Sequence, residues 1–346
     1  MLQGGRGATI RPMLPPPTLE RTRAALAALG DRIDRTPTRP WIQDLRSEGG
    51  EGPRLFLKLE LFQRTGTFKV RGALTNMLAA PPDALARGVT AVSAGNHAIA
   101  VAWAARELGT SARVVMLRSA NPARVSRCRG YGAEIELAPD GAAGFERVRQ
   151  IEREEGRIFI HPFEGEHTIL GTSTLGLELV EQEAGLEAVV VPVGGGGLIA
   201  GVSAAIKASC PDCAVYGVEP EGADTMRRSL EAGSPVALSS IQTIADSLGA
   251  PHAAPYGFSI VQRCVDRVIT VDDGQICEAM WILFADAKLA VEPASAAPLA
   301  ALRGPLAETL RGKRVALIIS GSNIDRGTFA EHVSRGDTST RVEESI

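Results

Sequence analysis

Short apolar runs alternate with longer segments rich in Ala, Leu, Glu and Arg along most of the chain. Each apolar run has the length of a strand, and a Gly-rich or polar turn separates it from the helical segment that follows. Strands are predicted over residues 89–92, 113–117, 133–138 and 158–162, and then over 188–193, 214–218, 268–271 and 315–319. Helices are predicted over 98–108, after Pro122, and over 142–155 and 198–208. Strands that alternate with helices predict an α/β fold with two open, parallel-type sheets covered by helices on both faces.

Five turn segments follow predicted strands or apolar runs: 65–69, 93–97, 194–197, 219–225 and 320–323. Right-handed crossovers place the carboxyl ends of parallel strands on one side of a sheet, where ligands bind. We therefore expect these five segments to face one cleft between the two sheets.

The charge balance narrows the classes of partner. The 346 residues include 37 Lys and Arg and 40 Asp and Glu, for a net charge of -3, which argues against a general nucleic-acid binder or a polybasic membrane surface. Five cysteines, an odd number, do not suggest a disulfide framework, so a reducing cytoplasm is expected. Residues 1–17 lack the apolar core of a signal peptide and no apolar stretch is long enough to span a bilayer. We expect disordered tails at about 1–17 and 333–346.

The four glycines Gly194, Gly195, Gly196 and Gly197 follow a strand and open a helix. Without Cβ atoms, their backbone N–H groups can converge on an anion at a helix N-terminus, which favours a phosphate site over a plain flexible turn. The segment is neither a Walker A loop nor GxGxxG, so a nucleoside triphosphate is not the expected ligand.

Other motifs are ambiguous when taken alone. Lys69 in TGTFKVRGA is either a solvated charge or a buried nucleophilic amine suited to a Schiff base. The SAGNH segment 93–97 caps a helix or binds a ligand. The CxxC at Cys210 and Cys213 is interpreted as a connector, because no second ligand pair completes a zinc site. Glu60, Glu219 and Glu292 could be ordinary charges at strand ends.

Taken together, four of these segments indicate a family. In order, LFLKLELFQRTGTFKVRGAL, SAGNHA, VVPVGGGGLIAG and SGSN resemble the fold-type II pyridoxal-phosphate enzymes, in the branch of serine/threonine dehydratases and serine racemases. The resemblance covers about residues 55–325. It implies a large domain of 1–83 and 167–346, a small domain of 84–166 inserted into it, and pyridoxal 5′-phosphate in the cleft.

The resemblance also implies roles for single residues. Lys69 would carry the cofactor covalently and act as the catalytic residue, and the cofactor would contact Phe68, Asn96, Gly194, Gly195, Gly196, Gly197, Leu198 and Ser320. Asn96 would donate to the ring 3′ oxygen and Ser320 would face the pyridine nitrogen. Ser93 and the turn that follows it, with Ala94, Gly95 and His97, would bind the substrate.

The implied activity is α,β-elimination of water from a 3-hydroxy amino acid such as L-threonine or L-serine, giving a 2-oxo acid and ammonia. The alternatives are a racemase or β-replacement enzyme of the same fold and, outside enzymes, a protein that binds a phosphate ligand. Racemases of the branch carry a second serine where Ala94 stands here, and alanine has no proton to transfer, so a lyase is favoured. The resemblance further implies a homodimer, with no nucleic-acid or membrane partner.

Several positions depart from the family pattern. Glu219 and Ala223 are weak metal candidates, because Thr225 stands where the second acidic ligand of cation-binding members would lie. Ser247 replaces a common glycine, and GTST at 171–174 replaces GQGT. The preferred substrate therefore stays open among threonine, serine, phenylserine and 3-hydroxyaspartate. With about 20 residues after Asp325, no isoleucine-binding regulatory domain is expected.

Overall fold

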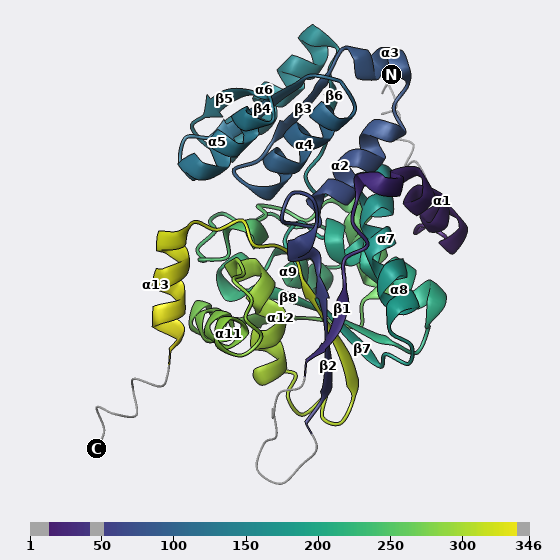
Figure 1. The fold of residues 1–346 in the computed structure, drawn as a ribbon, viewed down its shortest axis with the longest axis vertical. Helices are drawn as coiled ribbons and strands as arrows, with labels where there is room; N and C mark the ends of the chain where they lie inside the picture. Colours follow the sequence, from purple (N-terminus) through teal and green to yellow (C-terminus); the bar gives the residue numbers. More distant parts are fainter. Residues whose placement is uncertain (1–13, 42–51, 338–346) are drawn as a thin grey trace, which may run out of the picture.

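The computed structural model describes residues 14–41 and 52–337. A six-stranded sheet has the strand order β1-β2-β10-β7-β8-β9, and a separate four-stranded sheet has the order β5-β4-β3-β6. The six-stranded sheet consists of β1 (Thr38–Trp41), β2 (Arg54–Leu59), β10 (Arg314–Ile319), β7 (Ala188–Pro192), β8 (Ala214–Pro220) and β9 (Arg267–Val271). The four-stranded sheet consists of β5 (Glu134–Ala138), β4 (Ala112–Leu117), β3 (Val89–Val92) and β6 (Ile158–Phe159). Figure 1 shows the two sheets at opposite ends of the molecule.

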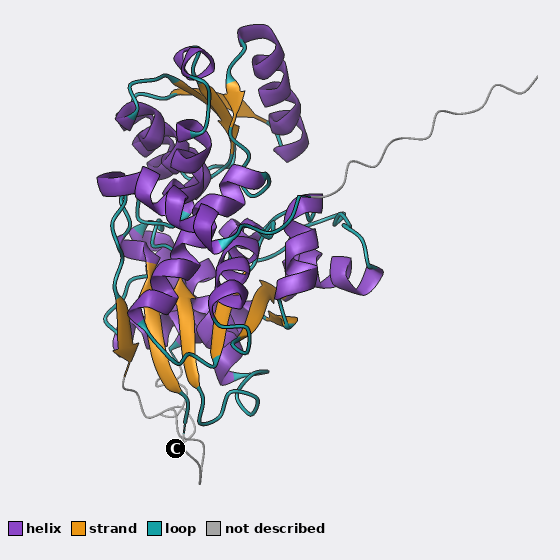
Figure 2. Cartoon of the chain, turned by 90° about the vertical axis from the view of Figure 1, so that its right-hand side faces the viewer, coloured by secondary structure: helices purple, strands orange, loops and turns teal. Residues whose placement is uncertain are grey.

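The helices lie mainly between strands. They are α1 (Leu19–Leu29), α2 (Lys69–Leu78), α3 (Pro82–Ala86), α4 (Asn96–Glu107), α5 (Pro122–Gly130), α6 (Gly141–Glu155), α7 (Glu166–Gln182), α8 (Gly197–Ser209), α9 (Thr225–Ala232), α10 (Pro255–Cys264), α11 (Asp273–Ala285), α12 (Pro293–Arg303) and α13 (Arg326–Gly336). Every pairing within the four-stranded sheet is parallel. The α/β fold with two largely parallel sheets is thus confirmed, and Figure 2 shows helices around both.

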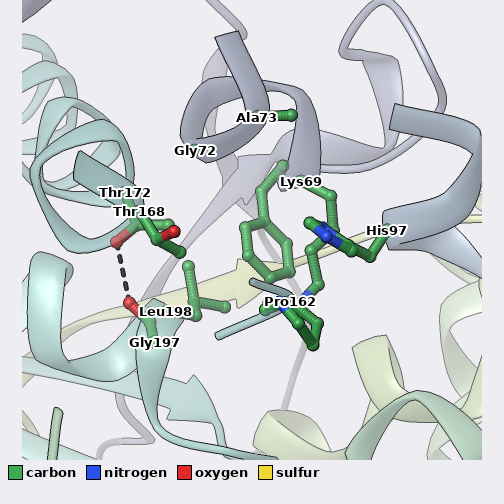
Figure 3. Close-up of a pocket in the computed structure, with 10 residues that line it drawn as sticks. Lys69, Gly72, Ala73, His97, Pro162, Thr168, Thr172, Gly197 and Leu198 are labelled. Atoms are coloured by element: carbon green, nitrogen blue, oxygen red, sulfur yellow. Dashed lines mark hydrogen bonds between the residues drawn. The ribbon is translucent and has the colours of Figure 1, made fainter. Parts of the chain in front are cut away.

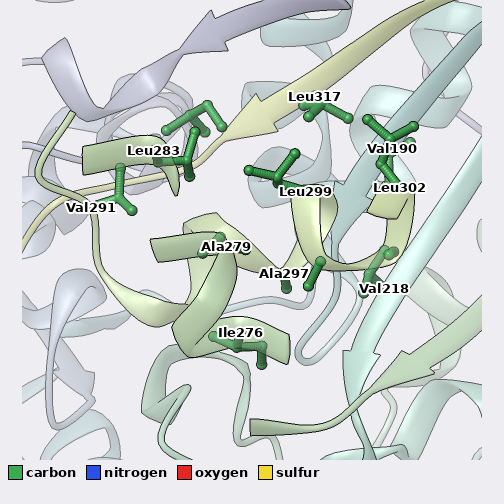
Figure 4. Close-up of a cluster of buried hydrophobic side chains, with 14 of the residues drawn as sticks. Val190, Val218, Ile276, Ala279, Leu283, Val291, Ala297, Leu299, Leu302 and Leu317 are labelled. Carbon is green, nitrogen blue, oxygen red and sulfur yellow. The ribbon is translucent and has the colours of Figure 1, made fainter. Parts of the chain in front are cut away.

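Alternating side chains of the central strands build two cores. Leu317 of β10 packs with Val190, Val218 and residues of α11 and α12, as Figure 4 shows. Ala316 and Ile318 point to the opposite face and pack with residues of α7, α8 and α10. A buried central strand requires apolar residues on both faces, which is why β10 and β7 are continuous apolar runs. The four-stranded sheet has the same arrangement, with α4 on one face and α6 on the other.

Three expectations need correction. The edge strand β1 was not expected, and it pairs with β2 antiparallel. Residues 14–17 of the tail expected to be disordered are placed, since the Pro15 carbonyl accepts a hydrogen bond from the Tyr256 hydroxyl at 2.9 Å and Pro17 is buried. Residues 333–336 complete α13, and Val333 is buried against the core. The rest of both tails, 1–13 and 338–346, lies outside the described residues.

Among the residues that the structure describes, no helix is both long and apolar enough to cross a membrane. The predicted domain boundaries at 83–84 and 166–167 fall within α3 and at the start of α7. Because the two sheets have separate cores, this division stays a prediction compatible with the packing.

Candidate active site

The turns after β3, β7 and β10 surround two adjoining cavities. The smaller has a volume of ≈ 40 Å³ and is lined by every residue expected to contact the cofactor: Phe68, Lys69, Asn96, Gly194, Gly195, Gly196, Gly197, Leu198 and Ser320. The larger has a volume of ≈ 430 Å³ and is lined by the residues expected to contact substrate: Lys69, Ser93, Ala94, Gly95 and His97. Lys69 and Asn96 line both cavities. The strand ends therefore bring together residues that are far apart in sequence.

The glycine loop between β7 and α8 is closely packed. A Cβ atom on Gly195 would lie 2.2 Å from the Phe163 ring, and one on Gly197 would lie 2.5 Å from the Phe163 carbonyl oxygen. Gly196 adopts φ 91°, a conformation that residues with a Cβ rarely adopt. Since α8 begins at Gly197, its free N–H groups face the loop and favour a phosphate there. A flexible turn would not need these close approaches.

Lys69 is the first residue of α2 and lies beside Pro162 and His97 (Figure 3). Its Nζ donates to the Pro162 carbonyl at 2.7 Å and lies 5.1 Å from the centre of the Phe68 ring. Burial lowers the pKa of the Lys69 amine to about 8, although the Glu292 carboxylate opposes this shift. A fraction of the amine is therefore uncharged near neutral pH, as a nucleophile or base requires.

Asn96 lies in the first turn of α4 and is surrounded by polar groups. Its Nδ2 donates to Glu292 Oε1 at 2.7 Å and contacts Ser247 Oγ at 3.3 Å. Glu292 is 2% exposed, and burial raises the pKa of its carboxyl group. Ser320 Oγ lies 3.0 Å from Ser295 Oγ. Interpreting Glu292 as an ordinary strand-end charge was therefore wrong, since it is buried beside the cofactor cavity.

The SAGNH turn does not cap α4 through a side chain. Gly95 is the N-cap residue, and Ser93 Oγ instead accepts a hydrogen bond from the Gly95 N–H at 3.1 Å. Burial lowers the pKa of His97 to about 3, so its ring is neutral, and Nε2 donates to the Ile160 carbonyl at 2.8 Å. His97 thus packs the turn against the residue that follows β6, while Ser93 retains a hydroxyl proton for a ligand.

A group of four fully buried charged residues lies below α2 and was not expected from the sequence. Arg71 donates to Glu60 and Glu178, each at 2.8 Å, and Lys58 donates to Glu178 at 2.8 Å. The four charges balance, and all four side chains are at most 1% exposed. Since Arg71 is two residues beyond Lys69, this ionic cluster fixes the start of α2. Its glutamates show that Glu60, too, is not an ordinary strand-end charge.

The weak metal candidate Glu219 caps a helix in this structure. Its carboxylate accepts hydrogen bonds from the backbone N–H groups of Met226 and Arg227 at 2.7 and 2.8 Å, and burial raises its pKa to about 8. The side chain of Asp224 pairs with Arg228 at 2.7 Å instead. Across the described part of the chain, no group of three or more His, Cys, Asp or Glu side chains could hold a metal ion. A cation at Glu219 and Ala223 stays an untested prediction.

An aromatic wall of the larger cavity was missed in the sequence. Phe145 of α6 and Phe163 both line the cavity. The ring of His252 lies 6.2 Å from the ring of Phe145 and 5.6 Å from that of Phe163, and His161 lies 4.7 Å from Phe163. These rings come from separate segments, although the motif HPFEG after β6 carries two of them. Aromatic residues make up only 4% of the chain, so their concentration here was the available signal.

Comparison with known proteins decides the family. Residues 31–321 match the family described as pyridoxal-phosphate dependent enzyme. The chain belongs to this family. A phenylserine dehydratase of Ralstonia pickettii is 52% identical over 314 residues, 90% of this chain and 96% of that protein.

Solved structures agree with this assignment. A bacterial threonine deaminase, from T.th., has a TM-score of 0.82 and 40% identity, covering 89% of this chain and 99% of that chain. Maize serine racemase has a TM-score of 0.83 and 33% identity, covering 92% and 98%. The resemblance to the serine/threonine dehydratase branch is confirmed.

The protein is a pyridoxal-phosphate-dependent lyase that dehydrates 3-hydroxy amino acids. The residues present fit this cofactor, since the glycine loop has space only for backbone around an anion and the Lys69 amine is buried next to it. The interpretation as a non-enzymatic phosphate-binding protein is set aside.

Proposed function

We propose that this pyridoxal-phosphate enzyme dehydrates 3-hydroxy amino acids with an aromatic group on C3, of the 3-phenylserine type. The observation that carries the proposal is the aromatic wall of Phe145 and Phe163 in the same cavity as Lys69. Aromatic rings pair edge-to-face or offset at about 4.5–7 Å between centres, and the rings of this wall already pack at such distances. A phenyl group on the substrate would extend this packing.

The charges of the larger cavity point the same way. Its charged lining side chains are Lys69, Arg124 and Asp246. Arg124 is paired with Asp246 at 2.5 Å, so its charge is already balanced. A second carboxylate on the substrate, as in 3-hydroxyaspartate, would have to compete with Asp246. Apolar side chains of Ile241, Ala250 and Pro251 complete the lining and favour an apolar substituent.

The 52% identical relative is named for phenylserine dehydration, which supports this substrate class over threonine or serine. The cavity of ≈ 430 Å³ is large enough for a substrate with a ring. A methyl group at C3 would leave the aromatic wall partly uncovered and would gain less from burial.

We propose the following roles for the residues of the site. The backbone N–H groups of the glycine loop bind the phosphate, Asn96 donates to the ring oxygen, and Ser320 faces the pyridine nitrogen. Ser93, with the backbone of the turn after it, binds the substrate carboxylate. Bound pyridoxal phosphate withdraws electrons from the Cα of the attached amino acid, which acidifies the α-proton.

Lys69 would remove that proton. Its Nζ lies at the junction of the two cavities, and the pKa of about 8 suits an amine that accepts and returns protons near neutral pH. Phe68 and Pro162 cover the amine on two sides and exclude water from it. The neutral His97 holds the substrate turn in place without competing for the proton.

The test is a comparison of kcat/KM for 2-oxo acid release from phenylserine, threonine, serine and 3-hydroxyaspartate. Burying a phenyl group instead of a methyl group contributes about 2 kcal/mol, so we expect phenylserine to exceed threonine by roughly 30-fold. Phe145→Leu should lower kcat/KM for phenylserine about 5-fold by removing one ring contact, and leave the value for threonine within about 2-fold. Phe284→Leu, on the exposed side of α11, is the matched control.

A preference for threonine, serine or 3-hydroxyaspartate would refute the aromatic substrate. Racemisation is the alternative reaction, and here the methyl group of Ala94 lines the cavity where an acid would be required. Chiral analysis of serine after incubation with the enzyme distinguishes the two reactions, since a racemase would form D-serine without matching pyruvate.

We further propose that residues 84–166 form the small domain and that the chain is a cytoplasmic homodimer. All five cysteines lie in the described part of the chain and are free, which agrees with a reducing compartment. The rings of Trp281, Phe284 and Phe329 form an aromatic patch between α11 and α13, with Phe284 43% exposed, and such patches favour association. Light scattering during size-exclusion chromatography would give the mass of the assembly, and a monomer would contradict the proposal.

A further inference from the structure

A chain of hydrogen bonds runs from the surface of α5 to the cofactor cavity. Arg127 Nη1 donates to Asn323 Oδ1 at 2.6 Å, and Asn323 Nδ2 donates to Asn96 Oδ1 at 2.7 Å. Asn96 Nδ2 in turn donates to Glu292. The four residues come from α5, the turn after β10, α4 and the start of α12, so two of them belong to each sheet's part of the molecule.

The direction of this chain is fixed by its outer groups. Arginine has donors only, so the Asn323 carbonyl must face Arg127. The Asn323 amide nitrogen then faces the Thr65 backbone carbonyl at 2.9 Å, which can only accept. The remaining N–H of Asn323 points to Asn96, whose oxygen must face it. The Asn96 NH₂ group is consequently turned toward the cavity.

Glu292 cannot fix this orientation by itself. A buried carboxyl whose pKa is raised can be protonated, and it then either donates or accepts a hydrogen bond. It would tolerate either face of the Asn96 amide. Asn323 is 8% exposed and has one permitted orientation, so the constraint comes from its side.

The surroundings of Asn323 are built closely around it. A Cβ on Gly66 would lie 2.8 Å from Asn323 Oδ1, and Gly66 adopts φ 75°. Ser322 N donates to the Gly66 carbonyl at 3.0 Å, and Phe68 N donates to the Ser320 carbonyl at 3.2 Å. The segment before Lys69 and the segment 320–323 are thus held together. Arg124 Nη2 adds a bond to the Asn323 carbonyl at 2.9 Å.

We propose that Asn323 is a positioning residue that fixes the Asn96 amide with its N–H toward the cofactor ring oxygen, and that Arg127 on α5 supports this orientation from outside. The proposal rests on the role of Asn96 given above. It implies that a contact made by the part of the chain with the four-stranded sheet adjusts the donor facing the cofactor.

The decisive variant is Asn323→Asp, which keeps the shape of the side chain. It replaces the amide nitrogen with an oxygen that would lie 2.7 Å from Asn96 Oδ1. Two acceptors repel each other, so the Asn96 amide turns over and presents its oxygen to the cofactor. The ring oxygen loses a donor that stabilises its anionic form.

Two properties of the bound cofactor report this change. In the holoenzyme, the pH at which the visible absorption of the cofactor titrates should move upward by about one unit, because the protonated form is no longer disfavoured. The affinity of the cofactor-free protein for pyridoxal phosphate should fall about 10-fold. Arg127→Met should shift the midpoint in the same direction by a smaller amount, because its side chain is exposed and Thr65 still orients Asn323. Arg127→Lys, which retains a donor, should restore most of the wild-type midpoint.

Asn121→Asp is the matched control. Asn121 Nδ2 donates to Asp325 at 2.8 Å, so it also joins the start of α5 to the segment after β10, without a bond to Asn96. This variant should leave the absorption midpoint unchanged. A wild-type midpoint and affinity in folded Asn323→Asp would overturn the proposal. If Asn323→Asp fails to give the circular dichroism spectrum of the wild type, an unchanged midpoint in Arg127→Met overturns it instead.

Asn96→Ala distinguishes this proposal from the one on which it rests. If Asn96→Ala leaves the midpoint and the affinity unchanged, the assigned role of Asn96 is wrong. If Asn96→Ala changes them and Asn323→Asp does not, Asn96 contacts the cofactor and the positioning role of Asn323 alone is wrong.

Discussion

Removing one carboxylate from the buried ionic cluster should destabilise the protein strongly. Glu178→Gln keeps the size of the side chain and removes one negative charge beside Arg71 and Lys58. Three hydrogen bonds end on the Glu178 carboxylate, two from Arg71 and one from Lys58, all at 2.8 Å. The variant leaves an uncompensated positive charge where the Lys58 and Arg71 side chains are 0% exposed.

Breaking one partner of a buried ion pair costs about 3–5 kcal/mol, because the remaining charge is neither solvated nor balanced. Gln retains one acceptor oxygen, so we expect about 3 kcal/mol for Glu178→Gln. Glu181→Gln is the control, since Glu181 lies on the same helix α7 and pairs with Arg35 at 3.1 Å with 39% of its side chain exposed. An exposed pair of this kind contributes at most about 1 kcal/mol.

The assay is urea unfolding followed by far-ultraviolet circular dichroism at pH 7 and pH 9. Burial lowers the pKa of Lys58 in the folded protein, while Glu60 and Glu178 raise it. Without Glu178, the pKa falls further, so the unfolded chain binds the Lys58 proton more readily than the folded chain. Stability then rises with pH, and the penalty of Glu178→Gln should be smaller at pH 9 than at pH 7. A loss of less than about 1 kcal/mol at pH 7, no larger than in the control, would refute the assignment of these charges as a mutually balanced cluster.

Three further outcomes follow from the site. Lys69→Ala should abolish 2-oxo acid release and leave the circular dichroism spectrum unchanged, and retained turnover would contradict the assigned role. Because the pKa of Lys69 is lowered to about 8, the uncharged amine should increase from about one tenth at pH 7 to about one half at pH 8. The rate at which the cofactor-free protein takes up pyridoxal phosphate, followed by absorbance, should therefore rise about 5-fold over this interval, and a flat profile would argue against it. Gly195→Ala, whose Cβ would lie 2.2 Å from Phe163, should weaken cofactor affinity by roughly 10-fold or more, in line with the roughly 1–3 kcal/mol of an overpacked site. Gly130→Ala, in open space on α5, should leave that affinity unchanged.

The sequence predicted the central strands well because their apolar runs are continuous. The strand expected over 188–193 corresponds to β7 (Ala188–Pro192), and that over 315–319 to β10 (Arg314–Ile319). A strand buried on both faces leaves little ambiguity. The edge strand β1 (Thr38–Trp41) gave no such signal, since its exposed and half-buried residues include Pro40. Proline interrupts strand patterns and is tolerated at an edge because no neighbour needs its N–H.

The candidate site could be predicted where motifs are continuous in sequence. The glycine loop and SAGNH each lie in one segment, so their proximity followed from strand order alone. The aromatic wall could not be predicted in this way, because Phe145, Phe163 and His252 belong to different segments and meet only in the tertiary fold. The buried charges were missed for the same reason. Glu178 and Arg71 are 107 residues apart, and a charged residue in a sequence is ordinarily interpreted as exposed.

The position of β10 affects how the protein is made. This strand is the last in the described part of the chain and lies between β2 and β7 in the six-stranded sheet. While a ribosome is still translating the segments before it, neither neighbour can complete its hydrogen bonds, and both present open edges that invite aggregation. The nascent chain must therefore remain unfinished at its centre until nearly all of it has emerged. Truncation before residue 314 would remove both the middle of the sheet and the turn that holds Lys69 in place.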